Sequence, residues 1–439
     1  MSSQSQDLVL AAGVRTPWAR AGGAFAREDA GHLGALVTRE LLARTGIRGQ
    51  DGGGIAELIA GCVGPPHDQA NVARVIALRA GLPQAMPART VARNCASGME
   101  SVSCAISALR AGEGEAFLCL GVEVMSRYPL VMNDALTGFF DSLSRARTPL
   151  AKLRSIARFR PAMLAPRIAL LEGLTDPVSG LIMGRTAEIL AREQSITREA
   201  ADQYALESHR RALTARTSGR FARELVPVLP QGARPGARPG ARPGPQPGPQ
   251  PGAQALAEDD AIRADQSLTA LAKLKPYFEK PDGRVTVGNS CGITDGACAL
   301  LVSTRAKAQS LGLKPLARIV AHAWTGCDPA RMGLGPVYAS REALRRADLS
   351  WKDMDVVEIN EAFAAQVLAC LRLLPELDPA RVNVNGGAIA LGHPVGATGS
   401  RLLLTLAHEL HERGARYGLA SLCIGGGQGG AFILERCES

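Results

Sequence analysis

Residues 91–101 read Val-Ala-Arg-Asn-Cys-Ala-Ser-Gly-Met-Glu-Ser and place Cys95 between a strand-like run and the first turn of a predicted helix. The free amides and the dipole of a helix N-terminus stabilise a thiolate. The pKa of such a thiol is expected to fall from about 8.5 to roughly 3.5–7.5. Cys95 is therefore a candidate nucleophile.

Two further reactive side chains lie in glycine-rich turns near the C-terminus. His393 stands in Gly-His-Pro at 392–394, and Cys423 in Leu-Cys-Ile-Gly-Gly-Gly at 422–427. An imidazole can take and return a proton near neutrality, which makes His393 a candidate base for Cys95. Cys423 is a candidate second acid or base.

The segments around these motifs predict two similar α/β halves. In the first half, apolar spacing predicts a helix over 97–111 and a buried strand over 116–120 that ends at Gly121. In the second half, the pattern predicts a helix over 398–413 and a strand over 419–424. Alternating strands and helices with glycine between them favour layered α/β architecture.

The order and flanking residues of these motifs resemble the thiolase family over nearly the whole chain. The other matching stretches are Arg15-Thr16-Pro17, Met183-Gly184, residues 289–296, Asn360-Glu361-Ala362-Phe363 and residues 383–387. The resemblance implies an α/β thiolase fold, with two related halves in an αβαβα arrangement and an inserted loop domain. It also implies an acyltransferase that cleaves 3-oxoacyl-CoA with CoA or runs this step in reverse.

By this resemblance, residues 1–124 form the N-terminal half, completed by 288–309, and 310–439 form the C-terminal half. Residues 125–287 are the inserted loop domain. Within the insert, residues 232–252 repeat Gly-Ala-Arg-Pro and then Gly-Pro-Gln-Pro. A segment this rich in proline and glycine does not pack into a core, so a disordered surface excursion is expected.

The resemblance also assigns catalytic roles. Cys95 would accept the acyl group, His393 would activate it, and Cys423 would move the α-carbon proton. Asn360, through a bound water, would form one oxyanion site together with His393. The backbone amides of Cys95 and Gly425 would form the second, and preorganised donors of this kind often contribute most to catalysis.

Substrate contacts follow from the same resemblance. Residues expected along the pantetheine and acyl pocket are Met183, Phe278 and Phe363. Arg263 is expected near the CoA phosphates. Cys291 stands where many short-chain members have a serine that contacts pantetheine, and Ile182 replaces a histidine found in some of them. Both departures favour a different chain-length preference.

Coenzyme A and acyl-CoA are thus expected as substrates, with no permanently bound cofactor. No Cys-x-x-Cys or His-x-x-x-His pair suggests a metal.

The composition indicates a soluble globular protein, with 46% hydrophobic and 21% charged residues. No apolar run approaches the roughly 20 residues of a membrane span, and the first residues lack a secretory signal, so a cytoplasmic location is expected. The ten cysteines are expected as free thiols. His408 and His411 fall on the polar face of a predicted helix and are expected to be solvated. The net charge of +9 comes without a nucleic-acid motif and suits an acidic ligand such as CoA.

Residues 142–167 interleave Leu, Ile and Phe with Arg and Lys, as in a basic amphipathic helix. The pattern alone leaves two interpretations equally open. One is a solvated helix packed on its own or a neighbouring subunit, and the other is a helix that contacts a partner protein or a membrane. In thiolases the inserted region covers the active site and builds the tetramer, which implies a homodimer or homotetramer. Its extra length is closest to the thiolase subunit of fatty-acid oxidation complexes, which associates with a multifunctional hydratase/dehydrogenase subunit.

Four functions remain for comparison. The first is thiolytic cleavage of 3-oxoacyl-CoA in fatty-acid β-oxidation, and the second is biosynthetic condensation of two acetyl-CoA molecules. A decarboxylating condensing enzyme uses one cysteine with His and His or Asn, and the Cys423 motif argues against it. A non-catalytic lipid-binding relative would lack one of Cys95, Asn360, His393 and Cys423, and all four are present.

Overall fold

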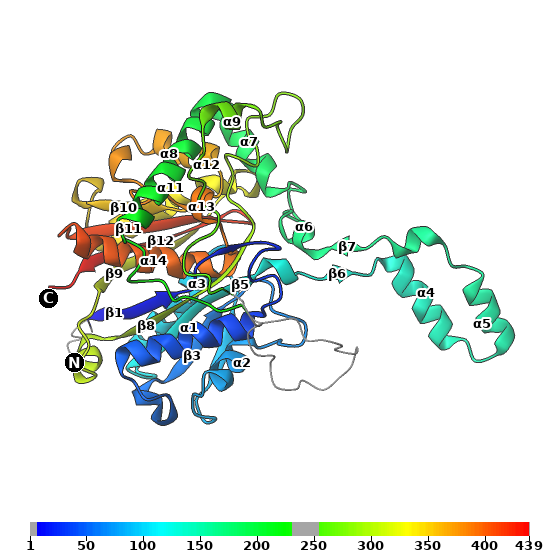
Figure 1. Ribbon diagram of the computed structural model, residues 1–439, viewed down its shortest axis with the longest axis horizontal. Helices are drawn as coiled ribbons and strands as arrows, with labels where there is room; N and C mark the ends of the chain where they lie inside the picture. The colour runs from blue at the N-terminus through cyan, green and yellow to red at the C-terminus, as the bar shows by residue number, and fades with distance from the viewer. Residues whose placement is uncertain (1–6, 231–253, 439) are drawn as a thin grey trace.

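The computed structural model describes residues 7–230 and 254–438, so the predicted disorder of 232–252 lies outside the described residues (Figure 1). A ten-stranded mixed sheet dominates the described part of the chain. Across this sheet the strands are β10 (Val356–Ile359), β11 (Tyr417–Ile424), β12 (Gln428–Arg436), β9 (Ala317–Gly326), β1 (Leu8–Arg15), β8 (Thr294–Thr304), β5 (Ala116–Val124), β3 (Glu57–Gly61) and β4 (Ala88–Val91), with β2 (Ala19–Arg20) paired to β8.

The sheet consists of two halves that meet at a short contact. Antiparallel pairing of β1 with β9 covers Val9 with Arg318 and Leu10 with Ala317. Each half has parallel pairs at its outer end, β3 with β4 and β5 in one and β10 with β11 in the other. The two related halves predicted from the sequence are therefore present.

Two helices form a central layer between the half-sheets. They are α3 (Ser97–Ala111) and α14 (Val395–Glu412). One buried apolar cluster joins side chains of both helices to strands of both halves. It includes Met99 of α3, Leu402 of α14, Phe117 of β5 and Phe432 of β12. Because α14 is covered on nearly all sides, it is hydrophobic around much of its circumference.

Two further helix pairs cover the outer faces. Helices α1 (Ala30–Thr45) and α2 (Val72–Arg79) pack on the N-terminal half, and α11 (Gly335–Ala347) and α12 (Ala364–Leu373) pack on the C-terminal half. This completes the predicted αβαβα layers (Figure 1). The predicted end of the fifth strand at Gly121 was wrong, since β5 continues to Val124. Gly121 instead allows a close approach, because a Cβ there would lie 2.5 Å from Gly396 O.

The region between β5 and β8 adds helices over the C-terminal half. Helix α8 contacts α12 and α13, and α7 contacts α12. The helices of this region are α7 (Met183–Glu193), α8 (Arg198–Thr217) and α9 (Leu268–Ala272), whereas α13 (Ala388–Leu391) belongs to the C-terminal half. Other short elements are α6 (Ala169–Gly173), α10 (Arg305–Ser310) and the 3-10 turns η1 (Gly49–Gly54), η2 (Met125–Arg127), η4 (Pro329–Leu334), η5 (Trp351–Asp353) and η6 (Pro379–Arg381).

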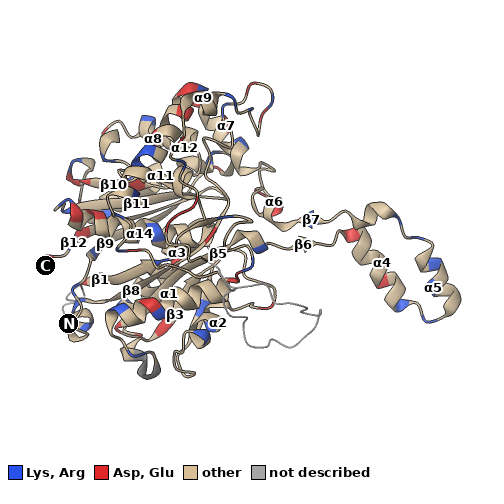
Figure 2. Cartoon of the chain, in the orientation of Figure 1, with Lys and Arg blue, Asp and Glu red and all other residues tan. Residues whose placement is uncertain are grey.

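Residues 130–168 form an arm that projects from the body of the molecule (Figure 1). A ribbon of β6 (Leu130–Val131) and β7 (Arg167–Ile168) carries α4 (Asp134–Arg145), α5 (Pro149–Ile156) and η3 (Pro161–Leu164). Residues 142–167 therefore do not pack on the body of their own subunit, and their contact with a neighbouring subunit, a partner or a membrane stays a prediction. Lys and Arg residues lie along α5 and in the chain beside it (Figure 2).

Several sequence-based expectations about individual groups are resolved by the fold. All ten cysteines are free thiols, as predicted. His408 and His411 are half-buried rather than solvated, and His411 Nε2 lies 2.6 Å from Leu316 O. Within residues 7–230 and 254–438, no helix is long and apolar enough to cross a membrane. In the same residues, no three or more His, Cys, Asp or Glu side chains are placed so that they could hold a metal ion together.

Candidate active site

Cys95 lies in a tight turn directly before α3. Asn94 has a left-handed backbone conformation with φ of 44°, which Asn tolerates better than most residues. The Asn94 side-chain Nδ2 donates to Gly425 O at 2.7 Å, so the turn before α3 is tied to the turn after β11. The backbone N–H groups of Gly425 and of Cys95 itself lie close enough to the Cys95 sulfur to act on the pKa of its thiol. The structure thus brings together both amides that the sequence predicts for one oxyanion site.

The predicted lowering of the Cys95 pKa was wrong. Burial raises the pKa of this thiol, and the nearby Glu123 carboxyl adds to the rise. The hydrogen bonds from the Gly425 and Cys95 amides act in the opposite direction but are outweighed. Since the thiol is protonated at neutral pH, a nucleophilic role for Cys95 requires a base.

His393 lies between α13 and α14, just before the N-terminus of α14. Cys95 stands in the same way just before α3, the other helix of the central layer. Helix α3, which follows Cys95, and helix α14, which follows His393, approach closely at their N-termini, where a Cβ on Gly98 would lie 2.9 Å from Gly396 O. Gly392 has φ of 99°, and His393 N donates to Gly292 O at 3.0 Å. These contacts fix the imidazole beside the loop that carries Cys291.

The hydrogen bonds of His393 define which ring nitrogen is free. Nδ1 lies 2.6 Å from Thr398 Oγ1, and the Thr398 hydroxyl donates to Pro394 O at 3.0 Å. Since that hydroxyl has one proton, we assign Nδ1 as the donor and Nε2 as the unprotonated nitrogen. Nε2 is buried without a protein partner in the described chain. Burial, with a smaller effect of Arg401, lowers the pKa of His393 to about 3, which keeps the ring neutral and able to accept a proton.

Cys423 and Cys291 complete a group of three neighbouring thiols with Cys95. Cys423 is buried near the end of β11, and burial raises its pKa, with further contributions from Cys95 and Cys291. Burial also raises the pKa of Cys291 to about 12, again with a contribution from Cys95. All three are therefore thiols rather than thiolates at neutral pH, and Cys423 is suited to donate a proton.

Asn360 follows β10, next to the strand that carries Cys423. Its backbone N–H donates to Ser421 O at 2.9 Å, and Ile359 pairs with Ser421 in parallel register. The side chain is 1% exposed, yet neither Oδ1 nor Nδ2 has a hydrogen-bond partner in the described residues. A buried amide without partners is costly, so this geometry calls for a water or ligand atom.

The predicted apolar pocket residues gather beside these groups. Phe278 and Phe363 make an edge-to-face contact with centroids 6.0 Å apart. Met183 Sδ would lie 3.4 Å from a Cβ on Gly425, and Phe363 belongs to the same buried cluster as Cys423. Arg263 differs: it is exposed, its backbone N–H donates to His209 Nδ1, and no described contact brings it to the thiols.

Three positions around the site were not predicted from the sequence. Thr398 orients His393, and its signal was only a threonine in the first turn after Gly-His-Pro. Asn94 fixes the Gly425 turn. Its position directly before the candidate nucleophile could have identified it from the sequence. Glu123 is fully buried and accepts from the N–H groups of Val63, Gly64 and Gly396, a long-range set of contacts with no local signature.

Comparisons with known proteins agree with this architecture. Family models described as thiolase N-terminal domain and thiolase C-terminal domain match residues 8–306 and 313–436. The chain is 41% identical over 431 residues to an acetyl-CoA acetyltransferase of Cupriavidus necator, covering 98% of this chain and 99% of the relative. It is also 41% identical to the 3-oxoadipyl-CoA/3-oxo-5,6-dehydrosuberyl-CoA thiolase of Escherichia coli, covering 98% and 100% of the two chains.

A solved structure gives the same result. Human mitochondrial 3-ketoacyl-CoA thiolase in complex with CoA superposes with a TM-score of 0.84 at 36% identity, covering 99% of this chain and 98% of that one. The chain belongs to the thiolase family. It is an acyltransferase of the acetyl-CoA acyltransferase class, and enzymes of this class use CoA substrates without a permanently bound cofactor.

Proposed function

We propose that this thiolase cleaves 3-oxoacyl-CoA with CoA through a thioester on Cys95. One observation carries the proposal: the Cys95 sulfur faces the Gly425 amide, while His393 Nε2 and the Asn360 amide are buried without protein partners. A site with a nucleophile, a free base and unpaired polar groups provides the parts that acyl transfer requires.

In the first half-reaction, His393 Nε2 takes the Cys95 proton while the sulfur attacks the C3 carbonyl. The bond between C2 and C3 then breaks, and its electron pair moves to C2 as the enolate of acetyl-CoA. Asn360, through a water, and the protonated His393 stabilise the enolate oxygen. The Cys423 thiol gives its proton to C2, and acetyl-CoA leaves. Cys95 now holds the shortened acyl group.

In the second half-reaction, the Cys423 thiolate first regains a proton from the protonated His393, and the neutral imidazole then takes the proton of an incoming CoA thiol. The CoA sulfur attacks the acyl carbon, whose oxyanion is stabilised by the amides of Cys95 and Gly425. Cys95 leaves as a thiolate and regains its proton from His393. Each proton taken in the first half-reaction is returned in the second, so the enzyme ends in its starting state.

Three features support the degradative direction and a role in fatty-acid β-oxidation. Cys291 and Ile182 place less polar side chains where some short-chain members carry Ser and His. Phe278 and Phe363 add apolar surface beside the thiols. The third feature is the arm, whose length resembles that of fatty-acid oxidation thiolases. The alternative is condensation of two acetyl-CoA molecules, which the same groups would perform in reverse and which the names of several relatives favour.

We also propose an assembly and a location. Strand β4 lies at one end of the sheet formed by the described residues, which leaves an edge for a second copy in a homodimer or homotetramer. The arm offers a surface for a hydratase/dehydrogenase subunit or for weak membrane contact. The ten free thiols support the cytoplasm, because a reducing compartment keeps cysteines unpaired. The division into halves at 1–124 with 288–309 and at 310–439, around an insert at 125–287, is part of this proposal.

CoA-dependent cleavage rates on a series of 3-oxoacyl-CoA substrates from four carbons upward test the proposal. Higher kcat/KM for six carbons and above supports the degradative role. Activity confined to the four-carbon substrate favours the biosynthetic alternative. No CoA-dependent cleavage of any member, with the protein folded, contradicts both.

A further inference from the structure

A buried ion pair connects the central helix α14 to strand β10. Arg401 Nη1 lies 3.2 Å from Glu358 Oε2, and both side chains are 1% exposed. The Arg401 guanidinium also lies over the Trp18 ring, 5.5 Å from its centroid. The reaction described above uses neither charged group.

The pair lies between two groups of the site. Glu358 is two residues before Asn360, and side chains two positions apart in extended chain point to the same side. Arg401 is eight residues after His393, about two turns of helix along α14. The ion pair therefore spans from the strand that ends at Asn360 to the helix that follows His393.

Stability alone does not explain this pair. Charges buried away from water lose solvation, and apolar residues of similar volume often replace such a pair without loss of stability. The polar atoms are also incompletely satisfied, because Arg401 Nε, Arg401 Nη2 and Glu358 Oε1 have no hydrogen-bond partner in the described chain. What the pair supplies instead is a directional contact between two elements.

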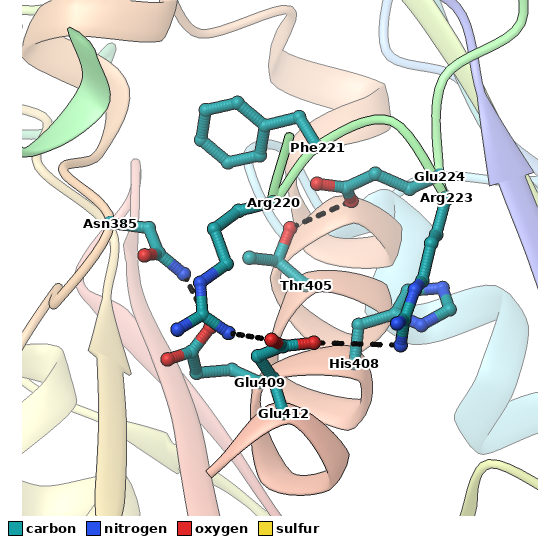
Figure 3. Close-up of a pocket in the computed structure, with 9 residues that line it drawn as sticks. All are labelled: Arg220, Phe221, Arg223, Glu224, Asn385, Thr405, His408, Glu409 and Glu412. Atoms are coloured by element: carbon teal, nitrogen blue, oxygen red, sulfur yellow. Dashed lines mark hydrogen bonds and ion pairs between the residues drawn. The ribbon is translucent and has the colours of Figure 1, made fainter. Parts of the chain in front are cut away.

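The polar contacts of α14 beyond Arg401 lie farther along the helix from His393. Figure 3 shows the Thr405 hydroxyl pointing at Glu224 and the Asn385 amide pointing at Glu409. Thr405 Oγ1 donates to Glu224 Oε2 at 2.9 Å, and Asn385 Nδ2 donates to Glu409 Oε2 at 2.7 Å. Near the end of the helix, Glu412 pairs with Arg220 at 2.8 Å, and both are about one-third exposed. These contacts hold α14 to the loop after α8 and to the segment before α13. They do not involve β10.

We propose that Arg401 and Glu358 are a positioning pair that sets the placement of Asn360 relative to His393. The inference rests on the proposed function, in which these two groups stabilise the enolate together. Loss of the pair would then impair the step that forms an enolate. It would spare acylation of Cys95 by acetyl-CoA, which needs His393 as a base but forms no enolate.

The test compares Glu358→Gln, Arg401→Met and the double variant Glu358→Met/Arg401→Met with wild type. Three quantities are measured: the melting temperature, the single-turnover rate of Cys95 acylation by acetyl-CoA, and kcat and KM for cleavage of a 3-oxoacyl-CoA. We expect kcat to fall at least tenfold in all three variants, with KM and the acylation rate within threefold of wild type. The double variant should recover stability relative to Arg401→Met without recovering kcat.

Glu412→Gln is the matched control, because it removes the ion pairs with Arg220 and Arg223 from the same helix at the far end from His393, and its kcat should stay within twofold. Wild-type kcat in Glu358→Gln, or acylation and cleavage that fall together in proportion to the folded fraction, would overturn the positioning role. Asn360→Ala, measured in parallel, distinguishes a failure of the proposed oxyanion site from a failure of the positioning role. If it cleaves normally, the proposed oxyanion site is wrong and the pair has no such role. If it loses activity while the pair variants do not, the positioning inference alone fails.

Discussion

His393 Nδ1 lies 2.6 Å from Thr398 Oγ1, and this single contact determines which ring nitrogen of the imidazole can accept a proton. The Thr398 hydroxyl donates its proton to Pro394 O, so it accepts one from Nδ1 and leaves Nε2 free. Thr398 therefore fixes the tautomer in which His393 can take a proton from the Cys95 thiol.

Replacing Thr398 by Val should remove this control. We expect kcat for thiolysis to fall about 10- to 100-fold, because the imidazole loses the contact that fixes its tautomer and orientation. Thr398→Ser keeps the hydroxyl and should stay within threefold of wild type. Steady-state kinetics on the same 3-oxoacyl-CoA measures both. Equal activity of the Val and Ser variants would show that the hydroxyl has no part in catalysis.

The raised pKa of Cys95 predicts how alkylation depends on pH. A thiol with a pKa above its ordinary value holds little thiolate at pH 7, and the thiolate fraction keeps growing as the pH rises through 9. The rate at which iodoacetamide labels the Cys95 peptide should therefore rise from pH 6 to pH 9 without levelling off. Peptide mass spectrometry distinguishes this label from one on Cys423. A plateau below pH 8 would show that the helix N-terminus lowers the pKa after all.

Residues 232–252 should be dispensable. The described chain on either side is held together, since Val228 and Leu256 exchange two backbone hydrogen bonds of 2.9 and 2.8 Å. A deletion of 232–252 should keep kcat within twofold of wild type and should leave the oligomeric state unchanged. A Gly/Ser segment of equal length serves as the control for composition. Loss of assembly or of most activity in the deletion would assign the repeat a structural role.

The arm is expected to bind a partner subunit or a lipid surface. Its apolar side chains are unusually exposed, with Leu150 and Leu153 at 59% and 63% of their full accessible area. Arg154, Arg158 and Arg160 lie beside them, and all three are exposed. The combination suits a surface that is both apolar and anionic.

Flotation with anionic vesicles and co-purification measure this binding. Charge reversal of the three arginines to Glu should abolish it, whereas reversal of the exposed Lys314 and Lys352 outside the arm should not. Thiolysis should be unaffected by either change. If the wild-type protein binds in neither assay, the arm has no such role.

The elements near the motifs could be predicted because their signals are local. The apolar spacing of 97–111 and the glycines around His393 and Cys423 correspond to α3 and to the turns that the structure contains. The pKa of Cys95 could not be predicted, because burial depends on what α14 and the Gly425 turn place around the sulfur. The same holds for the Arg401–Glu358 pair, whose members are 43 residues apart in the sequence. For the arm, interleaved apolar and basic residues predicted amphipathic helices, but only tertiary structure shows that they project from the body.

The Cys423→Ala variant incubated with acetyl-CoA tests the division of labour between the two cysteines most directly. Peptide mass spectrometry should find the acetyl group on Cys95 at a stoichiometry near that of wild type, since acylation needs only His393 as a base. The same variant should lose cleavage and condensation by at least 100-fold, because the α-carbon proton has no donor or acceptor. Near-normal cleavage by Cys423→Ala, or acetyl found elsewhere than on Cys95, would contradict the account.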